Sequence, residues 1–384
     1  MLSGWELGLF VASAVCIVGY FPIALLQDVG ILLTRLRRRR RRLPPPVPGR
    51  HVLVMMTTAG NAPHVVEKIL AELRGYGLPI ELAVVKEAGD LHRYPAAEIV
   101  VPPEYSTAHG SRRKMRAQQY AAEWLRQHGY GAETYVVHLD DDSVPDREYL
   151  EHVFGMHEEG GQGTLRLREY GRSLWTTLTD FVRVSDCDAF CANFNSLGQP
   201  MMVHGEGLTL RADVEEEIGW DYATFGAEDL MTGIQVGRRY RWGFIPYHIR
   251  IAPPITISDL YTQRRRWHYS FVSAARRIAG MRWSVMVWFI YRYYVGWTGL
   301  FGLTLWVANI ALGIPFPVWL VILGLFNLVS YFGFYQYGAW MTKGRYSILT
   351  LLLQFPVSYI ECGTLFYTLL RPPNPHGFDV IRKV

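Results

Sequence analysis

The sequence contains little cysteine, with only Cys16, Cys187, Cys191 and Cys362 among 384 residues. So few cysteines exclude a fold that depends on a framework of disulfides. Cys187 and Cys191 lie four residues apart, but no further Cys or His stands at the spacing of the common zinc-binding motifs. We therefore expect the cysteines to be packing residues rather than metal ligands.

The sequence also lacks the two glycine-rich signatures that hold the phosphates of nucleotides. Neither G-x-G-x-x-G nor G-x-x-x-x-G-K-[ST] occurs at the turns after its predicted strands, although it has 36 glycines. These absences argue against a conventional dinucleotide-binding domain and against a P-loop. Any bound nucleotide must therefore be held by other side chains.

Half of the residues are hydrophobic, and long apolar stretches stand at both ends of the chain. Residues 5–27 carry one charge and are long enough to cross a bilayer of ~30 Å. Further stretches of this kind lie at 283–314, 315–340 and 347–370. The sequence thus predicts one N-terminal and about three C-terminal transmembrane helices. Pro356 and Glu361 leave open a re-entrant or interfacial last segment.

Arginines at 37–42 and prolines between 44 and 48 follow the first apolar stretch. Signal peptides carry their positive charge before the apolar run, so we do not expect a cleaved secretory signal. Basic residues beside a span favour the cytoplasmic side and can contact anionic lipid headgroups. We therefore expect an integral membrane protein, in the plasma membrane if bacterial, with its main domain cytoplasmic. Nucleic acid is not expected as a partner.

Between residues 51 and 254, short apolar runs alternate with amphipathic stretches, which is typical of an α/β domain with a mostly parallel sheet. The pattern predicts strands at 51–57, 80–85, 98–101 and 135–139, with helices around 65–73 and at 111–128. Ligands of such sheets bind beyond the carboxyl ends of the strands. Thr57, Glu87 and Asp140 stand at such ends and could line one cleft.

Three consecutive aspartates, Asp140, Asp141 and Asp142, follow the predicted strand at 135–139. Adjacent carboxylates repel one another, so they favour a bound cation or several hydrogen-bond donors. Asp140 and Asp142 can turn toward one point, where their oxygens would suit Mg²⁺ or Mn²⁺. Asp141 would then face elsewhere. Alternatively, the triplet is an acidic turn before a helix at 146–156.

Two further charged motifs stand near predicted helix starts. Lys114 and Arg116 open the helix at 111–128, where they could reach phosphates or form a solvated basic turn. The sequence FGAEDL at 225–230 places Glu228 and Asp229 in a first helical turn, from which a carboxylate can be aimed into a cleft.

The sequence QRRRW at 263–267 directly precedes the C-terminal apolar stretches. Its arginines could neutralise a diphosphate and Trp267 could stack on a sugar ring. The alternative is an interfacial amphipathic helix that binds lipid. Upstream, the sequence HGEG at 204–207 would allow close approach of a ligand, or would simply turn the chain into a strand at 208–211.

In their order, DxD, ED and then QxxRW before a membrane block, these motifs resemble the membrane-bound inverting glycosyltransferases of family 2. That family includes cellulose and hyaluronan synthases and the egghead-type β-mannosyltransferases. The resemblance covers about residues 51–267, and HGEGLTLRADVEEEIGWD at 204–221 is most similar to the egghead type. Two positions depart from the family pattern. Ala227 stands where the synthases have threonine, and Glu87 where aspartate is more usual.

The resemblance implies a GT-A type nucleotide-sugar-binding domain and a role for each matching residue. Asp229 would be the general base with Glu228 beside it, and Asp142 with Asp140 would bind Mn²⁺ or Mg²⁺. The implied donor-binding residues are Thr57, Glu87, Lys114, Arg116, Asp140 and Arg266. The implied acceptor-binding residues are His204, Gly205, Glu206, Gln263 and Trp267.

The expected function is metal-dependent, inverting transfer of a hexose onto a lipid-linked or membrane-associated glycan. By resemblance, the nucleotide-sugar donor is GDP-mannose or else a UDP-hexose. A processive polysaccharide synthase is the alternative, although few spans make a polymer channel harder to build. A non-catalytic membrane sensor is less favoured, because candidate base and metal carboxylates are all present.

The expected organisation has six parts. They are an N-terminal transmembrane helix (1–30), a basic, proline-rich linker (31–50), the glycosyltransferase domain (51–256), interfacial helices with QxxRW (257–282), about three transmembrane helices (283–370) and a tail (371–384).

Overall fold

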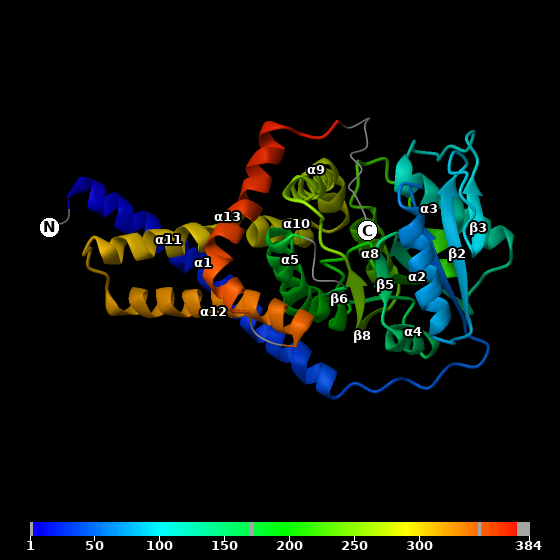
Figure 1. Ribbon diagram of the computed structural model, residues 1–384, viewed down its shortest axis with the longest axis horizontal. Helices are drawn as coiled ribbons and strands as arrows, with labels where there is room; N and C mark the ends of the chain where they lie inside the picture. The colour runs from blue at the N-terminus through cyan, green and yellow to red at the C-terminus, as the bar shows by residue number, and fades with distance from the viewer. Residues whose placement is uncertain (1–2, 169–172, 345–346, 375–384) are drawn as a thin grey trace.

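A computed structural model describes residues 3–168, 173–344 and 347–374, so most of the predicted tail lies outside the described residues. Figure 1 shows a sheet flanked by helices at one end of the molecule and long helices at the other. A layer of helices lies between them. This layer contains α5 (Leu174–Asp186), η1 (Cys187–Cys191), α6 (Ala192–Ser196) and α9 (Ile257–Met281).

One sheet of eight strands forms the centre of the α/β domain, in the order β3-β2-β1-β4-β7-β6-β8-β5. The strands are β1 (His51–Thr57), β2 (Ile80–Glu87), β3 (Ala97–Val101), β4 (Thr134–Asp140), β5 (Ser143–Pro145), β6 (Gly160–Leu167), β7 (Leu208–Arg211) and β8 (Trp242–Ile251). The first four in sheet order are parallel, which confirms the predicted half. The other half is mixed, because β7 runs antiparallel to β4 and to β6.

Helices cover both faces of the parallel half. The side chains of β1 alternate between two buried clusters, one beneath α2 (Pro63–Gly75) and one beneath α3 (Arg113–Gln127). Successive strand residues point to opposite faces, so each helix buries one apolar side of the same strand. The remaining helices of the domain are α4 (Arg147–Phe154), α7 (Ala212–Ile218) and α8 (Glu228–Arg239).

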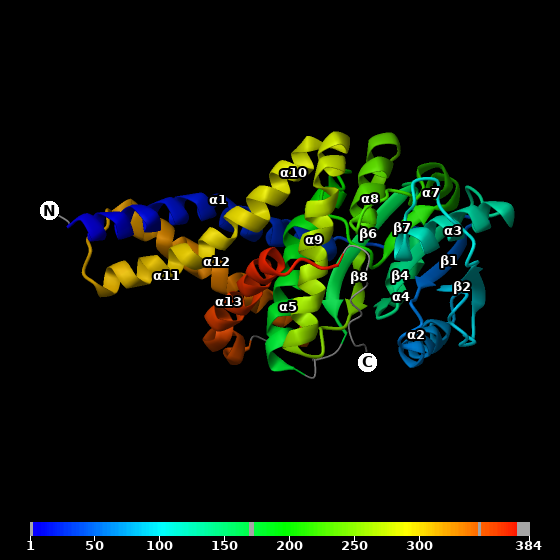
Figure 2. The ribbon, with the colours of Figure 1, turned by 90° about the horizontal axis from the view of Figure 1, so that it is seen from above.

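Within the described residues, three helices are long and apolar enough to cross a membrane: α1 (Gly4–Arg39), α12 (Val318–Lys343) and α13 (Ile348–Leu370). The predicted stretch at 283–314 is instead divided into α10 (Trp283–Phe289), the π-helical η2 (Ile290–Val295) and α11 (Trp297–Ala311). Figures 1 and 2 show α1, α11 and α12 lying side by side. Pro356 lies inside α13, where proline removes a helical hydrogen bond.

The basic segment after the first span is partly inside the protein. Helix α1 continues through Arg39, so the predicted linker begins later than residue 31. Arg38 Nη2 lies 2.6 Å from Asp188 Oδ1, and the hydroxyl of Tyr337 donates to the same carboxylate at 2.6 Å. The Arg41 guanidinium lies over the ring of Tyr247. These two arginines therefore contact the protein, and contact of the basic segment with lipid headgroups stays a prediction.

Helix α1 approaches η1 closely at Gly30. A Cβ atom added there would collide with the carbonyl oxygen of Ala189. Asn193 Nδ2 also donates a hydrogen bond to the Gly30 carbonyl at 2.9 Å. The absence of a side chain at Gly30 therefore lets the N-terminal helix dock on the layer beside the sheet.

Replacement of Gly30 by alanine should weaken this docking. Overpacking a close contact typically costs ~1–3 kcal/mol, so we expect Gly30→Ala to lower the unfolding midpoint of the detergent-purified protein by several degrees. Gly8→Ala in the same helix is the matched control, because a Cβ there meets nothing within 4 Å. Equal midpoints for the two variants would contradict this account.

Candidate active site

The aspartate triplet begins at the last residue of β4, where Asp140 stands opposite Thr57 of β1. Asp141 is buried, and its Oδ2 accepts a hydrogen bond from Thr58 Oγ1 at 3.0 Å. This bond joins the segments that follow β1 and β4. Asp141 thus has a structural role, which the sequence did not reveal.

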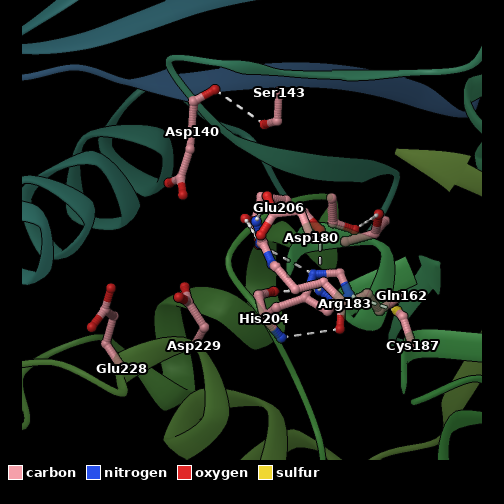
Figure 3. A network of polar contacts seen from close by, with 12 residues as sticks. Asp140, Ser143, Gln162, Asp180, Arg183, Cys187, His204, Glu206, Glu228 and Asp229 are labelled. Carbon is pink, nitrogen blue, oxygen red and sulfur yellow. Dashed lines mark hydrogen bonds and ion pairs between the residues drawn. The ribbon is translucent and has the colours of Figure 1, made fainter. Parts of the chain in front are cut away.

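The ammonium of Lys114 lies among three carboxylates. Its Nζ is 2.9 Å from Asp140 Oδ1, 3.5 Å from Asp229 Oδ1 and 3.6 Å from Glu228 Oε1. In Figure 3 these carboxylates point toward one common space. Burial opposes the charge of Lys114, but the carboxylates, Asp140 above all, raise its pKa well above the usual value. Lys114 is therefore the centre of a charged cluster, not part of a solvated turn.

Glu228 and Asp229 enter this cluster because of the turn that begins α8. Ala227 has a φ of 64°, in the left-handed region that side-chain-bearing residues rarely adopt. Backbone strain of this kind often occurs at functional sites. Burial raises the pKa of Asp229 to about 8, an effect that Lys114 opposes and Glu228 reinforces. A carboxylate with such a pKa can exchange a proton near neutral pH.

The loop at 204–207 packs directly against the cluster. A Cβ atom added at Gly205 would lie 2.6 Å from Lys114 Nζ and 2.7 Å from Asp229 Oδ2. Real Cβ atoms do not approach other atoms this closely, so a side chain at Gly205 would displace the charged ends of Lys114 and Asp229. The close neighbours of this glycine are thus the protein's own charged groups, and the approach of a ligand to the HGEG sequence stays a prediction.

Ion pairs fix the side chains of this loop. Glu206 Oε1 accepts from Arg183 Nη2 at 3.0 Å, and Glu206 Oε2 lies 3.4 Å from His204 Nδ1. Figure 3 shows this network beside the three carboxylates of the cluster. His204 and Glu206, both predicted to bind the acceptor, are therefore linked by these contacts to Arg183 of α5.

Glu87 at the end of β2 pairs with Arg116. Arg116 also donates to the backbone carbonyl of Tyr105 at 3.0 Å and to that of Pro102. Both side chains line the cavity described below. The ion pair with Arg116 therefore orients Glu87. Of the two basic residues predicted to reach phosphates, Lys114 and Arg116, the first lies within the carboxylate cluster and the second does not.

The QRRRW sequence lies on α9, where its residues have unequal surroundings. Gln263 and Arg264 are buried, and Arg264 Nη1 donates to Gln263 Oε1 at 2.6 Å. Arg264 Nη2 lies 2.6 Å from Asp180 Oδ1, and its Nε lies 2.7 Å from Glu361 Oε1. Arg264 therefore joins α9 to both α5 and α13.

Trp267 and Arg266 complete the motif at the edge of the cavity. The guanidinium groups of Arg183 and Arg264 lie over the Trp267 ring, 4.6 Å and 4.4 Å from its centroid. Trp267 thus already carries two cation–π contacts, and a sugar that stacked on it would share the ring with them.

A cavity of about 860 Å³ joins these groups. At one end it is lined by the strand ends, the Lys114 cluster, the 204–207 loop and the α9 motif. At the other end it reaches between the long helices, where its lining includes Tyr20, Leu300, Tyr331, Phe334 and Leu365. The charged site is therefore continuous with an apolar and aromatic space among helices that could cross a membrane.

Several residues at the site escaped the sequence analysis. They are Asp180, Arg183, Asp186, Arg292 and Glu361. Arg292 pairs with Asp186, and both side chains are mostly buried. A signal was present in the sequence, because charged residues inside an apolar helix usually have a partner.

Cys187 and Cys191 are buried, as expected of packing residues, and they also lie close to a histidine. This histidine is His204, which stands too far along the chain for the common motif spacings to indicate it. Its Nε2 is 3.4 Å from Cys187 Sγ, and the ligand atoms of all three residues lie within 4.8 Å of one another.

Comparison with known proteins supports the resemblance that the motifs indicated. The family model described as "Glycosyl transferase family group 2" matches residues 135–362. The β-1,4-mannosyltransferase egh of Drosophila melanogaster is 28% identical over 180 residues, which are 44% of this chain and 39% of that protein. The β-1,4-mannosyltransferase bre-3 of Caenorhabditis elegans is 27% identical over the same extent. The chain thus spans about two fifths of the length of these relatives.

A solved structure shares the fold. The mannosyltransferase PcManGT from Pyrobaculum calidifontis, in complex with GDP-Man and Mn²⁺, superposes with a TM-score of 0.50 at 17% identity. The match covers 89% of this chain and 98% of that one, so it includes both the mixed sheet and most of the helices beside it. The predicted GT-A type α/β fold is confirmed. With the family model matched over more than half of its length, the chain belongs to glycosyl transferase family group 2.

Proposed function

We propose that the protein is an inverting mannosyltransferase that moves mannose from GDP-mannose onto a lipid-linked or membrane-embedded acceptor. The observation that carries the proposal is the single cavity with the Lys114 cluster at one end and apolar helices at the other. The mannosyltransferase relatives and the GDP-mannose complex of PcManGT support the choice of donor.

The donor nucleotide would lie along the carboxyl ends of β1, β2 and β4. Thr57, Glu87 and Asp140 line the cavity there, as expected for ligands of a parallel sheet. The diphosphate is anionic, so it would compete with Asp140, Glu228 and Asp229 for the ammonium of Lys114, which lies 2.9 Å, 3.6 Å and 3.5 Å from these carboxylates. Arg266, which lines the same cavity from α9, would supply a second positive charge.

Asp140 and Asp142 fit a divalent cation. Both are carboxylates at the cavity, and hard oxygen donors suit Mn²⁺ or Mg²⁺. When bound, such an ion would offset the negative charge of the diphosphate. The Mn²⁺ in PcManGT is in keeping with this assignment.

Asp229 is the group best suited to take the proton of the acceptor hydroxyl. Its side chain is only 16% exposed, it lines the cavity and its pKa is raised to about 8. A buried carboxylate with a raised pKa is a stronger base than an exposed one. Glu228 contributes by keeping that pKa high, and the 204–207 loop would hold the acceptor near it.

The acceptor would enter from the membrane side. The helical end of the cavity offers aromatic and aliphatic side chains, which suit a lipid chain. A glycan carried by that lipid would then extend toward Asp229 and the Trp267 region. This arrangement explains why one cavity has such different ends.

Replacement of Asp229 by asparagine should separate donor binding from transfer. We expect Asp229→Asn to bind GDP-mannose with nearly unchanged affinity and to release GDP ~10² to 10⁴-fold more slowly when membrane lipid extract is added as acceptor. Glu217→Gln, at an exposed carboxylate remote from the cavity, is the control. If the asparagine variant transferred mannose at the wild-type rate, Asp229 would not be the base.

The pH dependence of transfer should report the same group. Because the deprotonated form of Asp229 is the base, kcat/KM for the acceptor should rise about tenfold per pH unit and level off near pH 8. Glu228 raises the pKa of Asp229, so Glu228→Gln should shift the rising part of the pH profile of kcat/KM to lower pH. A profile that stays in place in Glu228→Gln would contradict the coupling of the two carboxylates.

Removal of the divalent cation should abolish transfer. We expect EDTA to stop GDP release and Mn²⁺ or Mg²⁺ to restore it, with Asp142→Asn requiring about tenfold or more Mn²⁺ for half-maximal rate. Asp213→Asn is the control, because this carboxylate pairs with Arg211 away from the cavity. Full activity in EDTA would show that donor transfer needs no ion at Asp142.

A further inference from the structure

A second cluster of metal-ligating side chains lies at the acceptor loop, and its two thiols have no part in the proposed transfer. It consists of Cys187 and Cys191 at the ends of η1 and of His204 from the 204–207 loop. Their ligand atoms lie within 4.8 Å of one another, and His204 Nε2 is 3.4 Å from Cys187 Sγ. Two sulfurs and one imidazole nitrogen are thus gathered at one point from two segments of the chain.

The distances suit a tetrahedral ion. With Zn–S bonds of about 2.3 Å and Zn–N bonds of about 2.0–2.1 Å, ligand atoms around zinc stand roughly 3.6 Å apart. The observed 3.4 Å between Cys187 and His204 already matches that spacing. Small side-chain rotations would bring the third ligand into place.

The local backbone favours the same interpretation. Residues 187–191 form a π-helical turn in which the amide of Ala192 bonds to the carbonyl of Cys187. Such turns inside α-helices are rare and occur frequently at functional sites. Here the turn presents both thiols of a C-x-x-x-C pair to His204.

The other ring nitrogen of His204 has two polar neighbours. Nδ1 lies 3.0 Å from Gln162 Nε2 and 3.4 Å from Glu206 Oε2, and Glu206 is itself held by Arg183 at 3.0 Å. A carboxylate beside the second ring nitrogen of a metal-bound histidine orients the ring toward the metal, and Glu206 would take this role.

We propose that Cys187, Cys191 and His204 bind a Zn²⁺ ion, with Glu206 as the carboxylate behind the histidine. Thiolate and imidazole ligands select zinc over the magnesium and manganese that carboxylates prefer. The three residues line the cavity, so the fourth coordination position faces it and takes a water or an acceptor oxygen. The site is distinct from the one at Asp140 and Asp142.

The ion would join the acceptor loop to the helical layer. Cys187 and Cys191 belong to η1, which is joined to α1 by the ion pair of Asp188 with Arg38. His204 directly precedes Gly205, the glycine that packs against the Lys114 cluster. Zinc would therefore fix the loop between the membrane helices and the candidate base.

Metal analysis of the purified protein tests the proposal without any transferase assay, so its outcome is independent of the proposed function. Protein prepared without chelators should contain close to one zinc per chain by mass spectrometry. We expect Cys191→Ser to hold about tenfold less, while Cys362→Ser, which removes a buried thiol of α13, keeps the wild-type content. Asp142→Asn should also keep it, because that carboxylate belongs to the other site.

Two measurements on the wild-type chain cover the case in which a cysteine variant fails to fold. Co²⁺ loaded in place of zinc should give thiolate-to-cobalt charge-transfer absorption, and Zn²⁺ should protect Cys187 and Cys191 but not Cys16 from alkylation. Glu206→Gln should weaken zinc affinity ~10–100-fold in a chelator competition. Protein without zinc, cobalt absorption or metal-dependent protection would overturn the proposal, as would equal zinc loss in Cys362→Ser.

Discussion

The close approach of three carboxylates to one ammonium is the constraint on which the site depends. Asp140, Glu228 and Asp229 come from β4 and α8, and like charges brought this close destabilise a fold unless a cation lies among them. Lys114 supplies that cation from the first turn of α3. Three elements that are distant in sequence are thus held in one arrangement by charge balance, and the arrangement leaves Asp229 with a raised pKa.

Charge balance also extends from this cluster toward the long helices. Arg183 contacts Glu206 of the loop and Asp180 of its own helix, and Arg264 links Asp180 to Glu361 of α13. Removing one partner of a buried ion pair typically costs ~3–5 kcal/mol, because the other charge is left uncompensated. The position of α13 is therefore coupled to that of the acceptor loop through a chain of ion pairs between acidic and basic side chains.

The parallel half of the sheet and the motif positions could be predicted because each depends on local pattern. Strand β1 has an uninterrupted apolar run, and α2 buries the residues that its periodicity indicates. In the mixed half, β7 coincides with the strand expected at 208–211, but β6 and β8 could not be predicted in this way. Glycines at 160, 161 and 163 weaken the signal of β6, and Pro246 interrupts β8 near the point where the register of the two strands shifts. The glycines are needed there because, for example, a Cβ at Gly161 would meet Met156 at 2.6 Å.

The functional contacts that the sequence did not reveal share a physical cause. Arg183 with Glu206 and Cys187 with His204 join α5 and η1 to a loop that follows them in the chain, and no local periodicity encodes such a pair. The same loop contains Gly205, whose missing side chain lets the backbone pass between Lys114 and Asp229. A larger residue there would open the cluster to water, and solvation would return Asp229 toward the pKa of an ordinary carboxylate. The burial that makes Asp229 basic therefore depends on the loop that we assign to the acceptor, so base strength and acceptor position are set by one structural element.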